Sequence, residues 1–263
     1  DEGVWPAELW AVVEENGLTR PLLTEDKGGV DAGWQAVYVI LYAAGRFAAP
    51  IPLAETILAG WLLDQAGMEI PDGVLSIVPN SEDISVSGEM ISGGAINVPW
   101  ARQADYLVGI CRGDGGILVF CAPSTSFKAN ADHNIAREPR DEVFFDGNVV
   151  KGTPPGEFTV ETIQLYGALV RAGQMAGALE RIVEDTLQYT ADRTQFGKPI
   201  GKFQVIQQNL AMTAAEVAAA VMAAQNAFRA AERGLPDFET ACAKVLAGEA
   251  AGMASDVCHE THG

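Results

Sequence analysis

The sequence predicts an α+β fold in three parts, with a small antiparallel β domain at residues 71–157 between an N-terminal helical domain at 1–70 and a bundle of long helices at 158–263. Apolar residues recur at helical spacing in both outer parts. In the middle part, short apolar runs alternate instead with Gly, Asn, Asp and Pro, which is the pattern of strands joined by turns. Helices followed by strands and then by long helices are typical of an α+β chain.

Three helices are expected in the N-terminal domain. The first carries Trp5 and Leu9 on one face and ends at Gly17, which can take the left-handed conformation of a helix end. A second helix is predicted at about 33–48 and a third at about 53–66, because prolines interrupt the helical pattern between them.

The β domain and the C-terminal helices follow from the same reasoning. The strands are expected around four apolar runs, at 74–78, 107–110, 117–121 and 143–145. The first long helix starts near Thr159, and its apolar stripe consists of Leu165, Leu169, Ala172, Ala176, Leu179, Val183 and Leu187. The next helix, at about 205–233, is Ala-rich and apolar nearly all round, which is typical of a helix buried among others or at a subunit interface. A last helix is expected at about 238–262.

Charge and hydropathy exclude several function classes. The chain has 17 Lys and Arg against 35 Asp and Glu, a net charge of −18, and shows no basic surface for nucleic acid. No apolar run approaches the ~20 residues that span a bilayer. The first five residues lack the basic and apolar regions of a signal peptide, so a cytoplasmic location is expected.

Cysteine and histidine spacing does not predict a metal site. The four cysteines form no Cys-x-x-Cys pair, and free packed thiols in a reducing cytosol are expected. His259 and His262 lie on one helix face and could begin a metal site, but no third ligand is evident. Local capping or packing is therefore the favoured role, and no metal is expected.

The segment Arg193-Thr-Gln-Phe-Gly-Lys-Pro-Ile-Gly-Lys-Phe-Gln204, called the junction below, carries the chemistry. By residue type alone it is a connection between helices, in which Gly197 takes a left-handed cap and Pro199 prevents continuation. The junction closely resembles the hallmark segment of the acyl-CoA dehydrogenase family. Weaker similarity follows the family order through the rest of the chain, at residues 21–29, 45–50, 98–105, 137–141 and 262–263.

The resemblance implies the acyl-CoA dehydrogenase fold and FAD-dependent α,β-desaturation of an acyl-CoA thioester in β-oxidation, with electrons passed to an electron-transferring flavoprotein. In the family, the junction of one subunit grips the FAD pyrophosphate held by its neighbour, and a guanidinium suits this role because its fork matches phosphate oxygens. That role is carried to Arg193, with Gly263 matching the start of a late Gly-Gly-x-Gly turn. The cofactor-binding residues so implied are Arg193, Gln195, Phe196, Phe203, Gln204 and Gly263.

The chain departs from the family pattern in ways that bear on catalysis. The Thr-Glu-x-x-x-Gly-Ser-Asp segment that covers the flavin has no equivalent between residues 67 and 97, and Glu260 stands where the family often has Gln. One family position for the catalytic Glu is occupied here by Gly167, so no catalytic residue is assigned. The nearby carboxylates are interpreted as solvated helix charges: Glu161, Glu180, Glu184 and Asp185. Candidates for the anionic CoA are Arg102, Arg137 and Arg140, although surface or structural roles are favoured for each.

Three hypotheses remain. The preferred one is a partner subunit that completes the FAD site of a complete homologous subunit in a heterotetramer, as in family members that act on sterol side chains. The second is a self-sufficient homotetrameric dehydrogenase whose base lies beyond Gly263. The third is a flavin-free scaffold of the same fold, which the intact junction argues against.

Overall fold

The computed structural model describes residues 5–113 and 115–263. These form two compact units: one joins the residues up to Ala32 with Pro50–Gly167, and the other joins Gly33–Ala49 with Ala168–Gly263. A helix from the N-terminal part thus belongs with the C-terminal helices. The division at 1–70, 71–157 and 158–263 follows chain order and stays a prediction.

The helices of the first unit lie close to the predicted positions. Helix α1 (Ala7–Glu15) buries Trp10 and Val13. It is closed by Gly17 at φ 69°, and the Leu18 amide donates to the Val13 carbonyl at 3.1 Å. A single 3₁₀ turn, η1 (Glu25–Lys27), follows. Helix α3 (Leu53–Gln65) is buried on every face from Leu53 to Leu63, so it behaves as a core element and not as an amphipathic surface helix.

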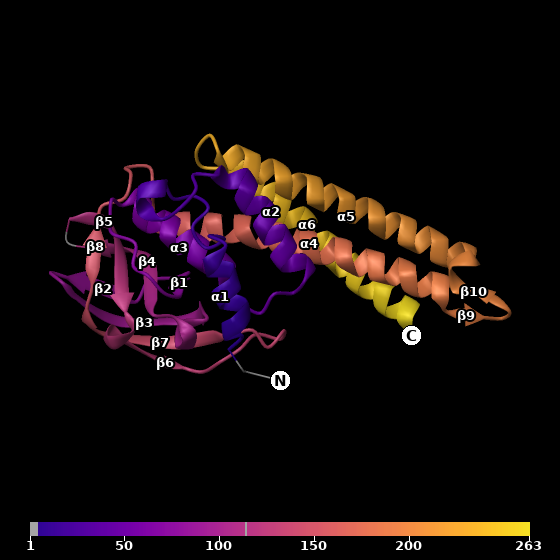
Figure 1. Cartoon of the computed structure of the whole chain (residues 1–263), viewed down its shortest axis with the longest axis horizontal. Helices are drawn as coiled ribbons and strands as arrows, with labels where there is room; N and C mark the ends of the chain where they lie inside the picture. The colour runs from indigo at the N-terminus through magenta and orange to yellow at the C-terminus, as the bar shows by residue number, and fades with distance from the viewer. Residues whose placement is uncertain (1–4, 114) are drawn as a thin grey trace. The chain divides into compact units, whose positions relative to one another are not determined.

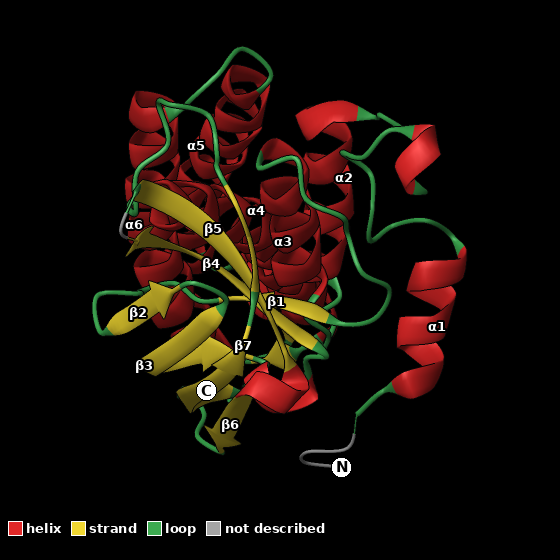
Figure 2. Cartoon of the chain, turned by 90° about the vertical axis from the view of Figure 1, so that its left-hand side faces the viewer, coloured by secondary structure: helices red, strands yellow, loops and turns green. Residues whose placement is uncertain are grey.

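The first unit contains one eight-stranded sheet in the order β6-β7-β3-β2-β4-β5-β8, with β1 beside β4. The strands are β1 (Leu75–Ile77), β2 (Ile84–Ser87), β3 (Met90–Pro99), β4 (Tyr106–Gly113), β5 (Gly116–Pro123), β6 (Phe127–Asn130), β7 (Arg140–Asn148) and β8 (Val150–Gly152). In Figure 2, β1 and β4 lie next to α3, whereas β6 lies toward the far side of the sheet.

The sheet corrects one expectation. It is mostly antiparallel, as predicted, but β1 pairs with β4 in parallel, with Leu75 opposite Tyr106, and β2 meets β4 in parallel at Val86 and Gly113. A parallel pair needs a crossover connection, which the residues between β1 and β4 supply by forming β2 and β3. Every residue of the apolar run at 74–78 is therefore buried, since β1 is covered on both faces.

The second unit is a set of long helices (Figure 1). Its helices are α2 (Gly33–Arg46), the part of α4 (Thr162–Asp192) from Ala168 onward, α5 (Gln204–Ala231) and α6 (Asp237–His262). The helices α5 and α6 approach closely because fully buried alanines line their contact: Ala220, Ala224, Ala227, Ala243, Ala247, Ala250 and Ala254. The predicted stripe of α4 is buried from Leu169 to Val183, whereas Leu187 is exposed.

Helix α2 crosses α4 at close range within the second unit. A Cβ on Gly45 would collide with the Gln174 carbonyl, and one on Gly177 would collide with the Tyr42 carbonyl. At the end of α2, Arg46 pairs with Glu184 at 2.5 Å. Backbone thus packs on backbone here, and only glycine allows that approach.

Across the described residues, no helix combines the length and apolar character that a bilayer crossing requires.

Candidate functional site

The junction forms a β-hairpin between the end of α4 and the start of α5 (Figure 1). Strand β9 (Thr194–Gln195) pairs with β10 (Lys198–Pro199), and a 3₁₀ turn, η4 (Ile200–Lys202), leads into α5. Gly197 takes the left-handed conformation that the sequence predicts, with φ 77°, but the helix cap expected there is wrong. Phe196 has φ 52° as well, and two central residues with positive φ are the mark of a type I′ hairpin turn.

Phe196 combines backbone strain with full exposure. Positive φ in a bulky non-glycine residue is an outlier that costs about 1–3 kcal/mol. The Phe196 side chain is 92% exposed, so no burial within this chain offsets that strain. Its ring only edges onto Phe203, with centroids 6.2 Å apart, and the Lys198 ammonium lies 4.4 Å from the Phe203 centroid. A strained, exposed aromatic at a hairpin tip points to a contact with another molecule.

The junction is also a locally basic segment of a chain that is acidic as a whole. Arg193, Lys198 and Lys202 are all exposed, and no acidic residue occurs from Arg193 to Ala215 although the net charge is −18. Within the described part of the chain, the Arg193 guanidinium has no hydrogen-bond or ion-pair partner, while Gln188 donates to the neighbouring Asp192 at 2.8 Å. Exposed cations beside an exposed ring suit the pyrophosphate and adenine of a dinucleotide.

The base of the hairpin is firmly attached to the helices. The Arg193 amide donates to the Tyr189 carbonyl at 2.8 Å, and the Ile200 amide donates to the Arg193 carbonyl at 2.8 Å. Gly201 lies against Thr190, since a Cβ there would be 3.1 Å from the Thr190 Oγ1. The hairpin is therefore a fixed projection, with its base set by α4.

The predicted cofactor residues fall in two places. Arg193, Gln195, Phe196, Phe203 and Gln204 share the hairpin and its exit into α5, and Gln204 is its exposed first residue. Gly263, 59 residues beyond Gln204, lies at the end of α6.

The two places are linked through Tyr189, which the sequence analysis does not single out, and His262, for which it favours local capping or packing. The ring of Tyr189 stacks on His262, with centroids 4.2 Å apart and planes at 19°. Lys198 and Lys202 were also missed, although the absence of acidic residues around them was a visible signal. Nothing in the spacing of Tyr189 indicates its contact with His262.

The carboxylates near Gly167 in sequence do not form a general base. Hydrogen bonding to Arg46 lowers the pKa of the Glu184 carboxyl, and hydrogen bonding to Thr159 lowers the pKa of Glu161. Glu180 lies 3.5 Å from Arg46, and Asp185 pairs with Arg181 at 2.7 Å. Glu184 and Glu161, whose pKa values are lowered in this way, are weak proton acceptors, while Glu180 and Asp185 lie beside arginines.

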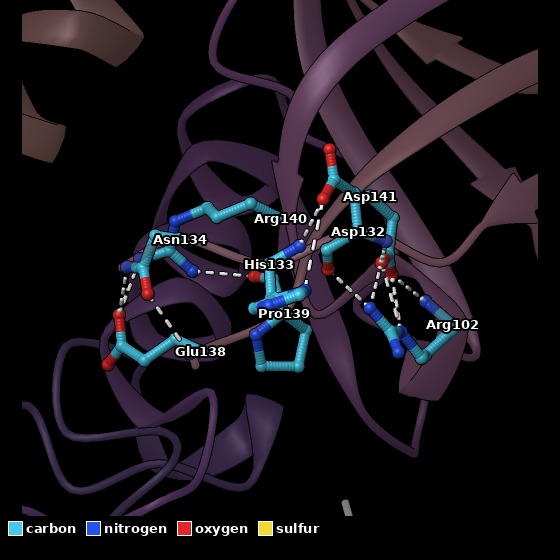
Figure 3. A network of polar contacts seen from close by, with 8 residues as sticks. All are labelled: Arg102, Asp132, His133, Asn134, Glu138, Pro139, Arg140 and Asp141. Carbon is cyan, nitrogen blue, oxygen red and sulfur yellow. Dashed lines mark hydrogen bonds and ion pairs between the residues drawn. The ribbon is translucent and has the colours of Figure 1, made fainter. Parts of the chain in front are cut away.

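Two of the arginines considered for CoA, Arg102 and Arg140, belong to a network of polar contacts in the β domain (Figure 3). Asp141 is fully buried and accepts from the Arg102 amide and Nε, each at 2.9 Å, and from the Asp132 amide at 3.1 Å. Arg140 pairs with Glu138 at 2.7 Å. Arg102 and Arg140 therefore stabilise the loop that precedes β7, in line with the structural role favoured for them.

The segment at 67–97 forms strands with short connections. Gly88 and Glu89 alone join β2 to β3, and Ser81 donates to the Ile110 carbonyl in the turn before β2. The described residues here thus include no long loop that could cover a flavin ring.

The histidines of α6 have local partners. The Thr186 hydroxyl lies 3.3 Å from His262 Nε2, and His259 Nδ1 lies 2.8 Å from the Ser255 carbonyl. No group of three potential metal ligands occurs among residues 5–113 and 115–263.

Comparison with known proteins gives consistent similarities. Residues 160–263 match the family described as acyl-CoA dehydrogenase, C-terminal domain. The acyl-CoA dehydrogenase IpdE2 of Mycobacterium tuberculosis is 26% identical over 97% of this chain and 74% of its own length.

Two solved structures share the fold. One is the ChsE4-ChsE5 complex of Mycobacterium tuberculosis, with a TM-score of 0.89 and 21% identity over 98% of this chain and 78% of that chain. The other is a Tcur3481-Tcur3483 steroid ACAD variant, with a TM-score of 0.86 and 23% identity over 97% of this chain and 77% of that chain.

Proposed function

Because the chain belongs to the acyl-CoA dehydrogenase family, we propose that it is a subunit of an FAD-dependent acyl-CoA dehydrogenase that completes the FAD site of a homologous partner subunit. The reaction is α,β-desaturation of an acyl-CoA thioester, with electron-transferring flavoprotein as acceptor. Sterol side-chain thioesters are the proposed substrate class, since a similar structure is described as a steroid ACAD and another as a two-protein complex.

One observation carries the proposal. The junction exposes Arg193 and a 92% exposed Phe196 with strained backbone, and both side chains are accessible to another molecule. The fork of Arg193 suits one pyrophosphate, and the Phe196 ring offers a stacking surface. Flavin, when bound, supplies the hydride-accepting chemistry, while the side chains of this subunit hold its phosphates. The residues assigned to this task are Arg193, Gln195, Phe196, Phe203, Gln204 and Gly263.

The outer face of α5 supports a partner of the same family. It begins at the junction and leaves Val205, Met212 and Met222 about half exposed or more. Glu216 and Arg229 are the charged residues of this 28-residue helix, in a chain in which 20% of residues are charged. A surface with three exposed apolar side chains and only these two charges, beside the proposed cofactor-binding hairpin, suits contact with a second helical bundle better than contact with water.

The pairing of Glu180, Glu184 and Asp185 with arginines and the short connections at 67–97 favour the partner role over self-sufficient catalysis. The visible spectrum separates the hypotheses. We expect the purified chain alone to be colourless and its complex with the partner to be yellow, with about one flavin per two chains. One flavin per chain in a homotetramer would support the self-sufficient enzyme, and colourless protein in both preparations would support the scaffold.

Substitution of Arg193 tests the grip directly. We expect Arg193→Ala to weaken FAD binding by the assembly roughly 10–100-fold, the effect of losing a charge-assisted bond of ~1.5–3 kcal/mol. Arg181→Ala is the control, since Arg181 is an exposed arginine on the same helix that pairs with Asp185 on that helix. Equal flavin retention by the two variants would contradict the role of Arg193.

A further inference from the structure

Tyr189 contacts both parts of the proposed cofactor site, which are the junction hairpin and the end of α6 at His262 and Gly263. Its carbonyl accepts the Arg193 amide at 2.8 Å, so it lies one helical turn before the hairpin. Its ring stacks on His262 at 4.2 Å, and its hydroxyl donates to the His262 carbonyl at 3.2 Å. His262 directly precedes Gly263. One residue thus contacts both the base of the hairpin and the end of α6.

The contact is more specific than ordinary helix packing. Nearby contacts between α5 and α6 use buried alanines, which fix no orientation about the helix axis. The Tyr189–His262 stack is half-exposed, nearly parallel, and joined by the Thr186 hydroxyl at 3.3 Å from His262 Nε2. Two polar bonds and one ring stack therefore define the position of His262 relative to the end of α4.

We propose that Tyr189 is a positioning residue that holds the Arg193 hairpin and the His262–Gly263 end of α6 at one fixed separation, so that both meet the pyrophosphate and adenosine of one dinucleotide. This inference rests on the proposed function. Its physical basis is preorganisation: side chains already held in the bound geometry lose less conformational entropy when the ligand binds.

The test is FAD titration of the flavin-stripped assembly of this chain with its partner subunit. We expect Tyr189→Leu, which removes both the stack and the hydroxyl, to raise the FAD dissociation constant about tenfold. Tyr189→Phe keeps the ring and is expected to stay within about threefold of the parent. His262→Ala should behave like Tyr189→Leu. The matched control is His259→Ala, because His259 bonds to Ser255, one turn earlier in its own helix.

A purely structural role predicts a different result. Tyr189→Leu would then lower the melting temperature without changing FAD affinity, and that outcome would overturn the inference. If Tyr189→Leu fails to fold, His262→Ala decides in the same way, since His262 is an exposed residue of the last turn.

Hydrogen exchange gives a second readout on the chain itself. The Ile200 amide, which donates to the Arg193 carbonyl, is expected to exchange faster in Tyr189→Leu and at the parental rate in His259→Ala. Unchanged exchange would also overturn the inference. The two proposals fail separately: if Arg193→Ala loses flavin and Tyr189→Leu does not, only the positioning role is wrong. If Arg193→Ala retains flavin, both are wrong.

Discussion

Phe196 illustrates how a single residue can favour function over stability. Type I′ turns normally carry Asn-Gly or Gly-Gly at their centre, because both residues need positive φ. Here the pair is Phe-Gly, with φ of 52° and 77°, and the phenyl ring is left in solvent. The turn holds the ring outward at the expense of folding energy, which is the behaviour of a residue selected for an external contact.

Replacement of Phe196 should separate stability from cofactor binding. Asparagine tolerates positive φ, so Phe196→Asn is expected to stabilise the isolated chain by about 1 kcal/mol, or roughly 2–4 °C in melting temperature. The same variant should retain less FAD in the assembly. Thermal unfolding and flavin absorbance measure the two effects. Phe238→Asn, at another exposed phenylalanine in unstrained backbone, is the control and should leave flavin retention unchanged. A variant that is no more stable and binds FAD normally would remove the argument from strain.

The buried thiols of the β domain should be chemically inert. Burial raises the pKa of Cys111 to about 11 and that of Cys121 to about 12. The thiolate is the reactive form, so both residues stay protonated at pH 8 and become reactive only on unfolding. Alkylation at pH 8 followed by peptide mapping should modify the partly exposed Cys242 well before Cys111 or Cys121. Equal labelling of the three in the folded protein would contradict this expectation.

At the scale of elements, the crossing of α2 and α4 depends on glycine. Gly45 and Gly177 each face a carbonyl of the opposite helix with no room for a Cβ. Gly45→Ala and Gly177→Ala are therefore expected to destabilise the chain by about 1–3 kcal/mol through overpacking. Chemical denaturation measures the change.

The matched control for this crossing is Gly248→Ala on α6. Gly248 is exposed, and a Cβ at this position would meet no neighbouring side chain or helix within 4 Å. The helix propensity of alanine should make that variant more stable by roughly 0.5–1 kcal/mol. If Gly248→Ala destabilised the chain as much as Gly45→Ala does, the effect would come from replacing glycine in any helix. The close crossing would then not explain it.

How well the sequence predicts an element depends on the range of the interactions that form it. The sequence predicts each of the six α-helices found among the described residues to within a few positions, since their apolar spacing and their Gly or Pro ends are local signals. The parallel pairing of β1 with β4 was missed, because strand direction is set by topology and not by residue pattern. The hairpin at Gln195–Lys198 was missed because its turn carries Phe in place of the usual Asn or Gly.

The candidate site follows the same division. Its residues were named through the resemblance of the junction, and the hairpin brings five of them to one end of the helices. The Tyr189–His262 stack joins residues 73 positions apart, and no local pattern in a single sequence encodes such a contact.

For the whole molecule, the uneven distribution of charge carries the last prediction. A net charge of −18 opposes self-association in general, yet the outer face of α5 is almost uncharged and includes Met212 at 48% exposure. If this face meets a partner bundle, a charge placed there loses its hydration on assembly, with Glu216 one turn away as the nearest charge on the helix. Met212→Lys should then weaken association with the partner by at least ~2 kcal/mol, roughly 30-fold, and reduce flavin retention in proportion. The isolated variant should melt within about 2 °C of the parent, because the side chain is solvated there.

Sedimentation of the mixed subunits measures association, and Val150→Lys on β8, at 64% exposure, is the control. Undiminished association of Met212→Lys would mean that the partner binds elsewhere, and the support that α5 gives to a two-subunit FAD site would be lost.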